Sequence, residues 1–201
     1  MLAHLRRSVI AIVAFTVFFG FVYAFAGTGV AQLLFRHQAD GSITANGSTL
    51  IGQNWSATKC PGHPNGSCVF QGRPDALGPY AGGDGDNPLV YNGASGESAA
   101  TNLGPRSKVL VANNEALVAY WHKRGVQPTP DLVTTSGSGL DPDITPPDAL
   151  AQIPMVSAAT GLSASTLRRL IAKETHGEEF GFLGSSYIDV LQLNEALSAL
   201  T

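Results

Sequence analysis

The chain has 201 residues, a formal net charge of −3 and only 13% charged residues. This length suits one domain, and the weakly acidic balance gives no electrostatic support for binding nucleic acid. Charged residues fall well below the roughly 25% usual in soluble domains, because an uncharged N-terminal run and long Gly-, Ser-, Thr- and Asn-rich stretches contain almost none.

The N-terminal run predicts a membrane helix. Residues 9–26 carry no charge and consist mainly of Phe, Val, Ile and Ala. At 1.5 Å per residue they nearly cross a hydrocarbon core of about 30 Å, and weakly polar residues up to Phe35 extend the span. Arg6 and Arg7 precede it, so the positive-inside tendency leaves the N-terminus in the cytoplasm. We therefore predict a cytoplasmic stub and membrane helix over 1–35 and an extracytoplasmic domain over 36–201.

A second interpretation of the same run is a cleaved signal peptide. Ala24-Phe25-Ala26 has the small-x-small pattern of a cleavage site, and the apolar residues before it resemble a signal core. Both interpretations place the remaining chain outside the cytoplasm.

Two cysteines enclose a short segment of turn-forming residues. Cys60 and Cys68 flank Pro-Gly-His-Pro-Asn-Gly-Ser, whose composition brings the ends of the segment together. In an exported domain this arrangement predicts a disulfide. Free thiols and half of a metal site are the alternatives, although zinc would need more ligands than His63 supplies.

The elements after the predicted membrane helix are mostly helical. A short strand is expected over 47–55, and loop over 75–105, where Gly, Asp and Asn dominate. The apolar spacing over 107–124 predicts a helix that ends in basic residues and is stopped by Gly125.

Three further helical signals follow toward the C-terminus. Thr145 and Asp148 have the spacing of a helix start, and Pro154 is expected to break or kink the helix that follows. A helix over 163–176 should end at Gly177. Asp189 should cap a terminal helix whose inward side chains are Val190, Leu193, Ala196, Leu197 and Leu200. The pattern predicts one α+β domain with a small sheet.

Catalytic signatures are few in the sequence. It contains no phosphate-binding loop ending in Gly-Lys-Ser/Thr, no Asp-Lys-Thr-Gly-Thr and no His-Glu-x-x-His. Residues 93–97 lack the last glycine of a nucleophile elbow. Asp141 and Asp143 resemble a carboxylate pair for a cation, but Pro142 between them favours side chains that point apart.

Several blocks along the chain resemble one family when taken together and in order. These blocks are Phe35–Ile43, Gly47–Trp55, Phe70–Ala76, Asn102–Pro105, Asp131–Pro142 and Val190–Leu197. In this order they resemble the C subunit of Kdp-type potassium-transporting P-type ATPases. The chain departs from the family pattern at Asp75, which stands where serine is usual, at Met155, which stands where arginine is usual, and in its cysteine loop.

The resemblance implies an accessory role in a bacterial inner-membrane pump. Its partners would be a channel-like potassium-binding subunit, a P-type ATPase subunit and a small assembly subunit, with membrane lipid around the helix. The family is proposed to raise the ATP affinity of the ATPase subunit, so ATP would act through that partner. Because an external domain cannot touch a cytoplasmic nucleotide site, we expect any such effect to be coupling between distant sites.

The residues expected to contact a partner or ligand are Arg73, Asn102, Ser136, Gly137, Ser138, Gly139 and Asp141. Arg73 would form either an inter-subunit ion pair or a pair with an aspartate of its own chain. The 136–141 loop would either meet a partner or order the domain itself. No catalytic residue or metal ligand is assigned. The competing hypothesis is an exported, anchored hydrolase or binding domain unrelated to transport, with Ser95 or Ser136 beside a histidine.

Overall fold

The computed structural model describes residues 2–53, 55, 60, 67–74 and 98–201. The chain divides into two compact units, Met1–Ala45 and Asn46–Thr201.

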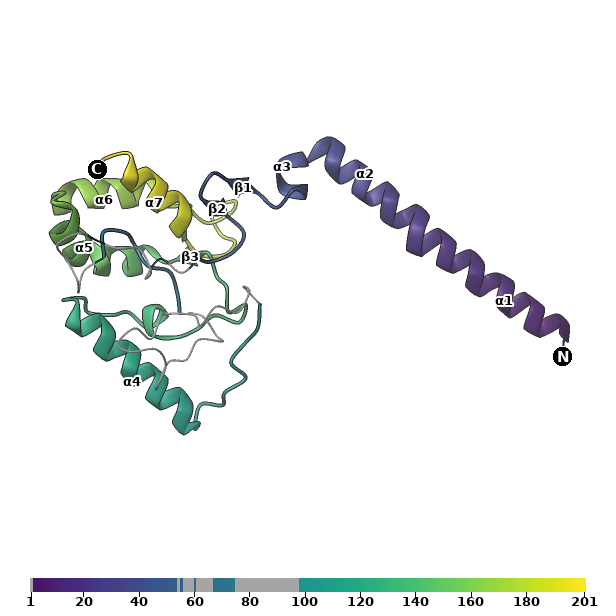
Figure 1. Cartoon of the computed structure of the whole chain (residues 1–201), viewed down its shortest axis with the longest axis horizontal. Coiled ribbons are helices and arrows are strands. Elements are labelled where there is room, and N and C mark those ends of the chain that lie inside the picture. The colour runs from purple at the N-terminus through teal and green to yellow at the C-terminus, as the bar shows by residue number, and fades with distance from the viewer. Residues whose placement is uncertain (1, 54, 56–59, 61–66, 75–97) are drawn as a thin grey trace. The chain divides into compact units, whose positions relative to one another are not determined.

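The first unit is dominated by one continuous apolar helix (Figure 1). It comprises α1 (Leu2–Val17), a π-helical turn η1 (Phe18–Tyr23) and α2 (Ala24–Leu34). Its large apolar side chains are exposed on every face. Among the described residues, this is the one helix long and apolar enough to cross a membrane. A short α3 (Arg36–Ala39) and β1 (Ile43–Thr44) follow.

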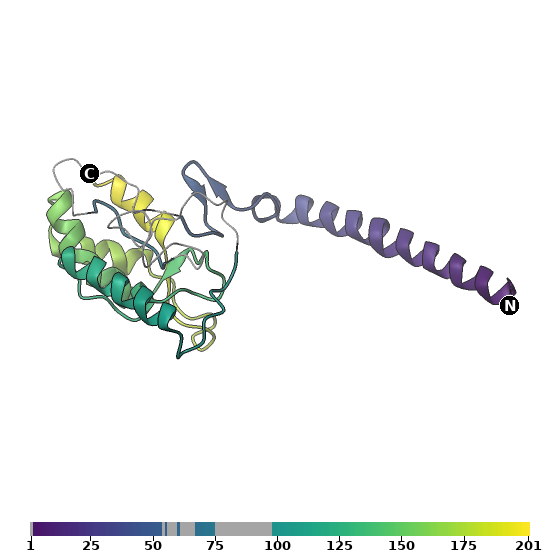
Figure 2. The same ribbon diagram turned by 60° about the horizontal axis from the view of Figure 1, so that its bottom comes forward.

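The second unit packs helices around a minimal sheet (Figures 1 and 2). Its elements are β2 (Gly47–Ser48), α4 (Lys108–Lys123), the 3₁₀ turn η3 (Asp131–Val133), β3 (Asp143–Ile144), α5 (Pro146–Thr160), α6 (Ala164–Glu174), β4 (Ile188–Asp189) and α7 (Val190–Ser198). Helix α5 packs on α6, and α6 packs on α7. Strands β3 and β4 pair antiparallel, with Asp143 opposite Asp189. The predicted α+β class with a small sheet is confirmed.

The predicted helix starts are also confirmed. Thr145 and Asp148 form a reciprocal capping box at the start of α5. The side chain of Asp189 accepts a hydrogen bond from the Gln192 backbone N–H and caps α7. These caps satisfy donors that the first helical turn leaves unpaired, so short polar residues mark where each helix begins.

Other local predictions were wrong. The strand expected over 47–55 shrinks to β2, and residues 49–50 form a turn. Helix α6 ends at Glu174 rather than His176, because His176 pairs with Tyr187 instead.

Details of α5 and α7 also differ from the expectation. Of the break or kink expected at Pro154, the break does not occur, because α5 continues to Thr160. The proline ring removes a hydrogen bond to the carbonyl of Leu150, and both residues are exposed, so water can reach that carbonyl. Leu200 lies beyond the end of α7 and is exposed rather than buried.

A buried segment, residues 70–71, lies between α5 and α7. Side-chain amides of these helices bond its backbone, which pairs with no strand among the residues that the structure describes. Asn194 accepts from the Phe70 N–H (2.8 Å) and donates to the Phe70 carbonyl (2.9 Å). Gln152 makes the equivalent pair with Gln71, at 2.8 and 3.0 Å. All four residues are buried, so these bonds satisfy backbone groups that water cannot reach.

Replacing Asn194 by leucine is expected to destabilise the domain by about 2–4 kcal/mol, because both polar groups of Phe70 would be buried without a partner. Chemical unfolding of the full chain in detergent measures this loss. The control is Gln192→Leu on the same helix, where the side chain is half-exposed. Equal stability of the two variants would contradict the role given to the amide.

Candidate functional site

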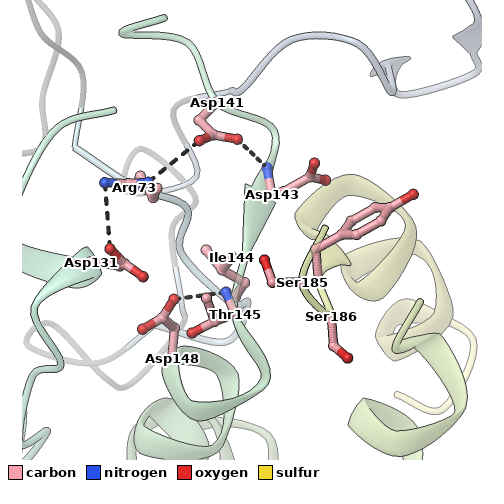
Figure 3. Close-up of a pocket in the computed structure, with 10 residues that line it drawn as sticks. Arg73, Asp131, Asp141, Asp143, Ile144, Thr145, Asp148, Ser185 and Ser186 are labelled. Carbon is pink, nitrogen blue, oxygen red and sulfur yellow. Dashed lines mark hydrogen bonds and ion pairs between the residues drawn. The ribbon is translucent and has the colours of Figure 1, made fainter. Parts of the chain in front are cut away.

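Arg73 lies at the centre of an acidic cluster in the second unit (Figure 3). Its guanidinium pairs with Asp131 of η3 and with Asp141, each at 3.5 Å. It also donates to the Thr134 carbonyl at 3.4 Å. Its side chain is only 20% exposed, so solvent screens these pairs less than it screens a surface ion pair. Arg73 therefore pairs with aspartates of its own chain, and the inter-subunit ion pair stays a prediction.

Asp141 links this cluster to the start of β3. One of its oxygens faces Arg73, and the other accepts from the Asp143 N–H at 3.1 Å (Figure 3). The Asp141 carboxylate is thus engaged through both oxygens, by Arg73 and by the Asp143 backbone. Asp148, fully buried, accepts from the Thr145 N–H and from the Thr129 hydroxyl.

The predicted contact loop lies just before Asp141. The hydroxyls of Ser136 and Ser138 are 3.0 Å apart, and Ser138 also accepts from the Leu140 N–H. Gly139 is buried with φ +70°, a conformation that favours glycine. The side chains and backbone of this loop thus make turn-stabilising contacts with one another, while Gly137 and Ser138 remain exposed.

A second glycine lets another segment approach this loop closely. The Gly52 N–H donates to the Leu140 carbonyl at 2.8 Å. A Cβ atom at position 52 would lie 2.6 Å from the Asp141 carbonyl oxygen, closer than packing allows. In the sequence, the one sign of this contact is that Gly52 falls within the strand expected over 47–55, where a glycine can mark a close backbone approach.

The remaining predicted residues lie apart from Arg73 in sequence and have different roles. Asn102 is exposed and has φ +55°, a left-handed backbone conformation in the segment before α4. Cys60 and Cys68 are joined in a disulfide. Ser95 lies outside the described residues.

An open pocket of about 290 Å³ adjoins Arg73. Acidic side chains predominate among its charged groups, and Ser185, Ser186 and Tyr187 form part of its wall. Burial, together with the nearby charges of Asp141 and Asp189, raises the pKa of Asp143 to about 6, whereas His176 acts in the opposite direction. Burial also raises the pKa of Asp189.

The geometry bears on two chemical roles, metal binding and hydrolysis by a serine beside a histidine. Within the described residues, no group of three or more His, Cys, Asp or Glu side chains is placed to hold a metal ion. The residues that line the pocket beside Arg73 include neither Ser136 nor a histidine. What the arrangement provides is an internally paired cation that joins η3, the 136–141 loop and the buried 70–71 segment.

Comparison with known proteins identifies relatives over nearly the whole chain. The family model described as "K+-transporting ATPase, c chain" matches residues 5–199. Proteins named potassium-transporting ATPase KdpC subunit include one from Sorangium cellulosum, 39% identical over 98% of both chains. The one from Methylorubrum extorquens is 39% identical over 98% of this chain and 97% of its own. A Rhodopseudomonas palustris protein of the same name is 38% identical over 99% of this chain and 98% of its own.

Replacing Asp143 by asparagine is expected to raise thermal stability at pH 7.5. The pKa of this carboxyl is about 6 in the folded chain and near 3.8 when unperturbed, so the ionised form is less favourable in the folded state. Its destabilising effect is full above about pH 6, diminishes as the pH falls and vanishes below about pH 3.8.

Melting temperatures of the full chain between pH 4 and 8 test this expectation. The gap between variant and wild type should narrow as the pH falls through 6. Glu115→Gln, at an exposed position of α4, serves as the control. A gap that does not change with pH would show that Asp143 is not the titrating group.

Proposed function

The chain belongs to the KdpC family of K⁺-transporting ATPase subunits, and from this membership we propose that it is a non-catalytic accessory subunit of a potassium-uptake pump. In this role it holds the channel-like and P-type ATPase subunits together and covers the outer potassium entrance. The observation that carries the proposal is the family match, which spans residues 5–199 and so includes both the apolar helix and the folded domain.

The helix is proposed to remain in the membrane as an anchor. The family match begins before the apolar run and continues through the domain, which supports a helix that is retained together with the domain. Arg6 and Arg7 precede the run, and Arg36 is the first charge after it. This favours a cytoplasmic N-terminus and an extracytoplasmic domain at the bacterial inner membrane.

The Arg73 cluster supports an accessory role rather than a reaction. A catalytic cation would be directed toward substrate, but this guanidinium is committed to two aspartates and a carbonyl of its own chain. Ser136, one of the serines in the hydrolase hypothesis, bonds with Ser138. These contacts favour an ordered scaffold that presents a surface to partners.

ATP is proposed to act only through the ATPase subunit. With the domain outside and nucleotide hydrolysis inside, an effect on ATP affinity would require coupling across the membrane. Such coupling arises when this subunit binds one conformation of the pump more tightly than another. It requires no nucleotide site in the chain itself.

Tagged chain is expected to co-purify with the channel-like, ATPase and small assembly subunits from detergent-solubilised membranes of potassium-starved cells. Deleting its gene should abolish high-affinity potassium uptake, and the full-length gene should restore it. Recovery of the chain alone, with uptake intact after deletion, would refute the proposal.

Impermeant thiol reagents are expected to label Cys60 and Cys68 in intact cells after mild reduction, because the proposed topology places both outside. The control is a Cys60→Ser, Cys68→Ser double variant, which should not be labelled. Labelling of the natural cysteines only after lysis would reverse the proposed orientation.

A further inference from the structure

Residues 176–187 form a hydrogen-bonded hairpin between α6 and β4. His176 and Tyr187 exchange backbone hydrogen bonds of 2.8 and 3.1 Å, and their rings stack with centroids 4.9 Å apart. Nearer the tip, Glu179 and Leu183 exchange two bonds of 2.9 Å. These pairs fix the backbone of the tip, residues 178–183.

The tip presents large apolar side chains to solvent. Phe180 is 85% exposed, Phe182 73% and Leu183 49%. Isolated exposed apolar residues are common, but three of them gathered on one turn mark a surface that another molecule covers. Phenylalanine is also enriched where proteins bind one another.

The backbone of the tip is strained at one of these residues. Phe180 has φ +54°, in the left-handed region that bulky side chains rarely adopt. Gly181 follows it with φ +78°. A glycine at position 180 would adopt this turn at lower cost, so the aromatic side chain is not explained by the local fold. Strain of this kind concentrates at functional positions.

Charge distinguishes the partners that fit this tip. Glu178 and Glu179 are exposed beside the phenylalanines, and no lysine or arginine follows Lys173 in the chain. Anionic lipid attracts basic segments, so two carboxylates oppose insertion into such a bilayer. They also oppose the pairing of two identical tips. A protein surface with cations beside an apolar pocket is complementary to both features.

We propose that the 178–183 tip docks into an apolar pocket, bordered by lysine or arginine, on another subunit of the pump. The inference rests on the proposed function, since it takes the partner from that complex. Phe180 and Phe182 fill the pocket, and Glu178 and Glu179 pair with its rim. The fixed hairpin lowers the entropic cost of binding because the tip is already ordered.

Photo-crosslinking in membranes tests where the tip lies. The full chain, carrying a benzophenone amino acid in place of Phe182, is co-expressed with the other pump subunits and irradiated. The same probe at Val109, an exposed apolar residue of α4, is the control. The proposal expects an adduct between position 182 and a pump subunit, identified by mass spectrometry. Adducts with lipid alone, with a second copy of the chain, or with nothing would overturn it.

Affinity measurements with tip variants give an independent test. Phe182→Asp is expected to weaken association with the remaining subunits by at least roughly 10-fold, as for a buried interface residue, whereas Val109→Asp should have little effect. A Glu178→Lys, Glu179→Lys double variant should also weaken association. Phe180→Gly should weaken it while keeping or raising the melting temperature, because glycine relieves the strain.

The controls separate failure of this inference from failure of the proposed function. If wild-type chain does not co-purify with the pump subunits, the proposed function fails. If wild-type chain and the tip variants associate equally well, only the docking proposal fails. Loss of association in Phe182→Asp together with a lowered melting temperature, and normal association of Phe180→Gly, would show that the tip contributes to folding rather than docking.

Discussion

The second unit depends on two buried side-chain amides that take the place of a neighbouring strand. Asn194 and Gln152 project from α7 and α5 and bond both backbone groups of Phe70 and Gln71. Without these amides, the buried backbone groups of residues 70–71 would lose their hydrogen-bond partners. In the described part of the chain each strand is two residues long, and these side chains satisfy backbone groups that a longer sheet would pair.

This constraint also places the acidic cluster. The paired segment leads through Gly72 directly to Arg73, so fixing Phe70 and Gln71 fixes where the guanidinium emerges. From there its ion pairs gather Asp131 and Asp141, which are distant from it in the sequence. The ion pairs of Arg73 therefore form only when the core is assembled. Losing these pairs would make both the 136–141 loop and the Arg73 side chain less ordered.

The sequence predicted those features that depend on neighbouring residues. Capping by Thr145, Asp148 and Asp189 follows from local hydrogen-bond chemistry, and the apolar helix follows from length and composition. Pairing of Arg73 with an aspartate was one of two options that the sequence left open. The amide bonds of Gln152 and Asn194 were missed because they join residues far apart in the chain, and neither amide has a local signature. The strand expected over 47–55 failed because residues 49–50 turn, which leaves Leu50 and Ile51 exposed and outside the described strands, and β propensity alone does not decide pairing.

Gly52 has no side chain, yet its close packing constrains the position of Asp141 and, through it, of the Arg73 side chain. Its backbone lies against Asp141 so closely that any Cβ would displace the carbonyl, and Asp141 in turn holds Arg73. In a systematic substitution scan, changes at position 52 would therefore have the same effect as changes at Arg73 or Asp141. The intolerance would reflect excluded volume transmitted through the main chain, rather than any chemistry at that position.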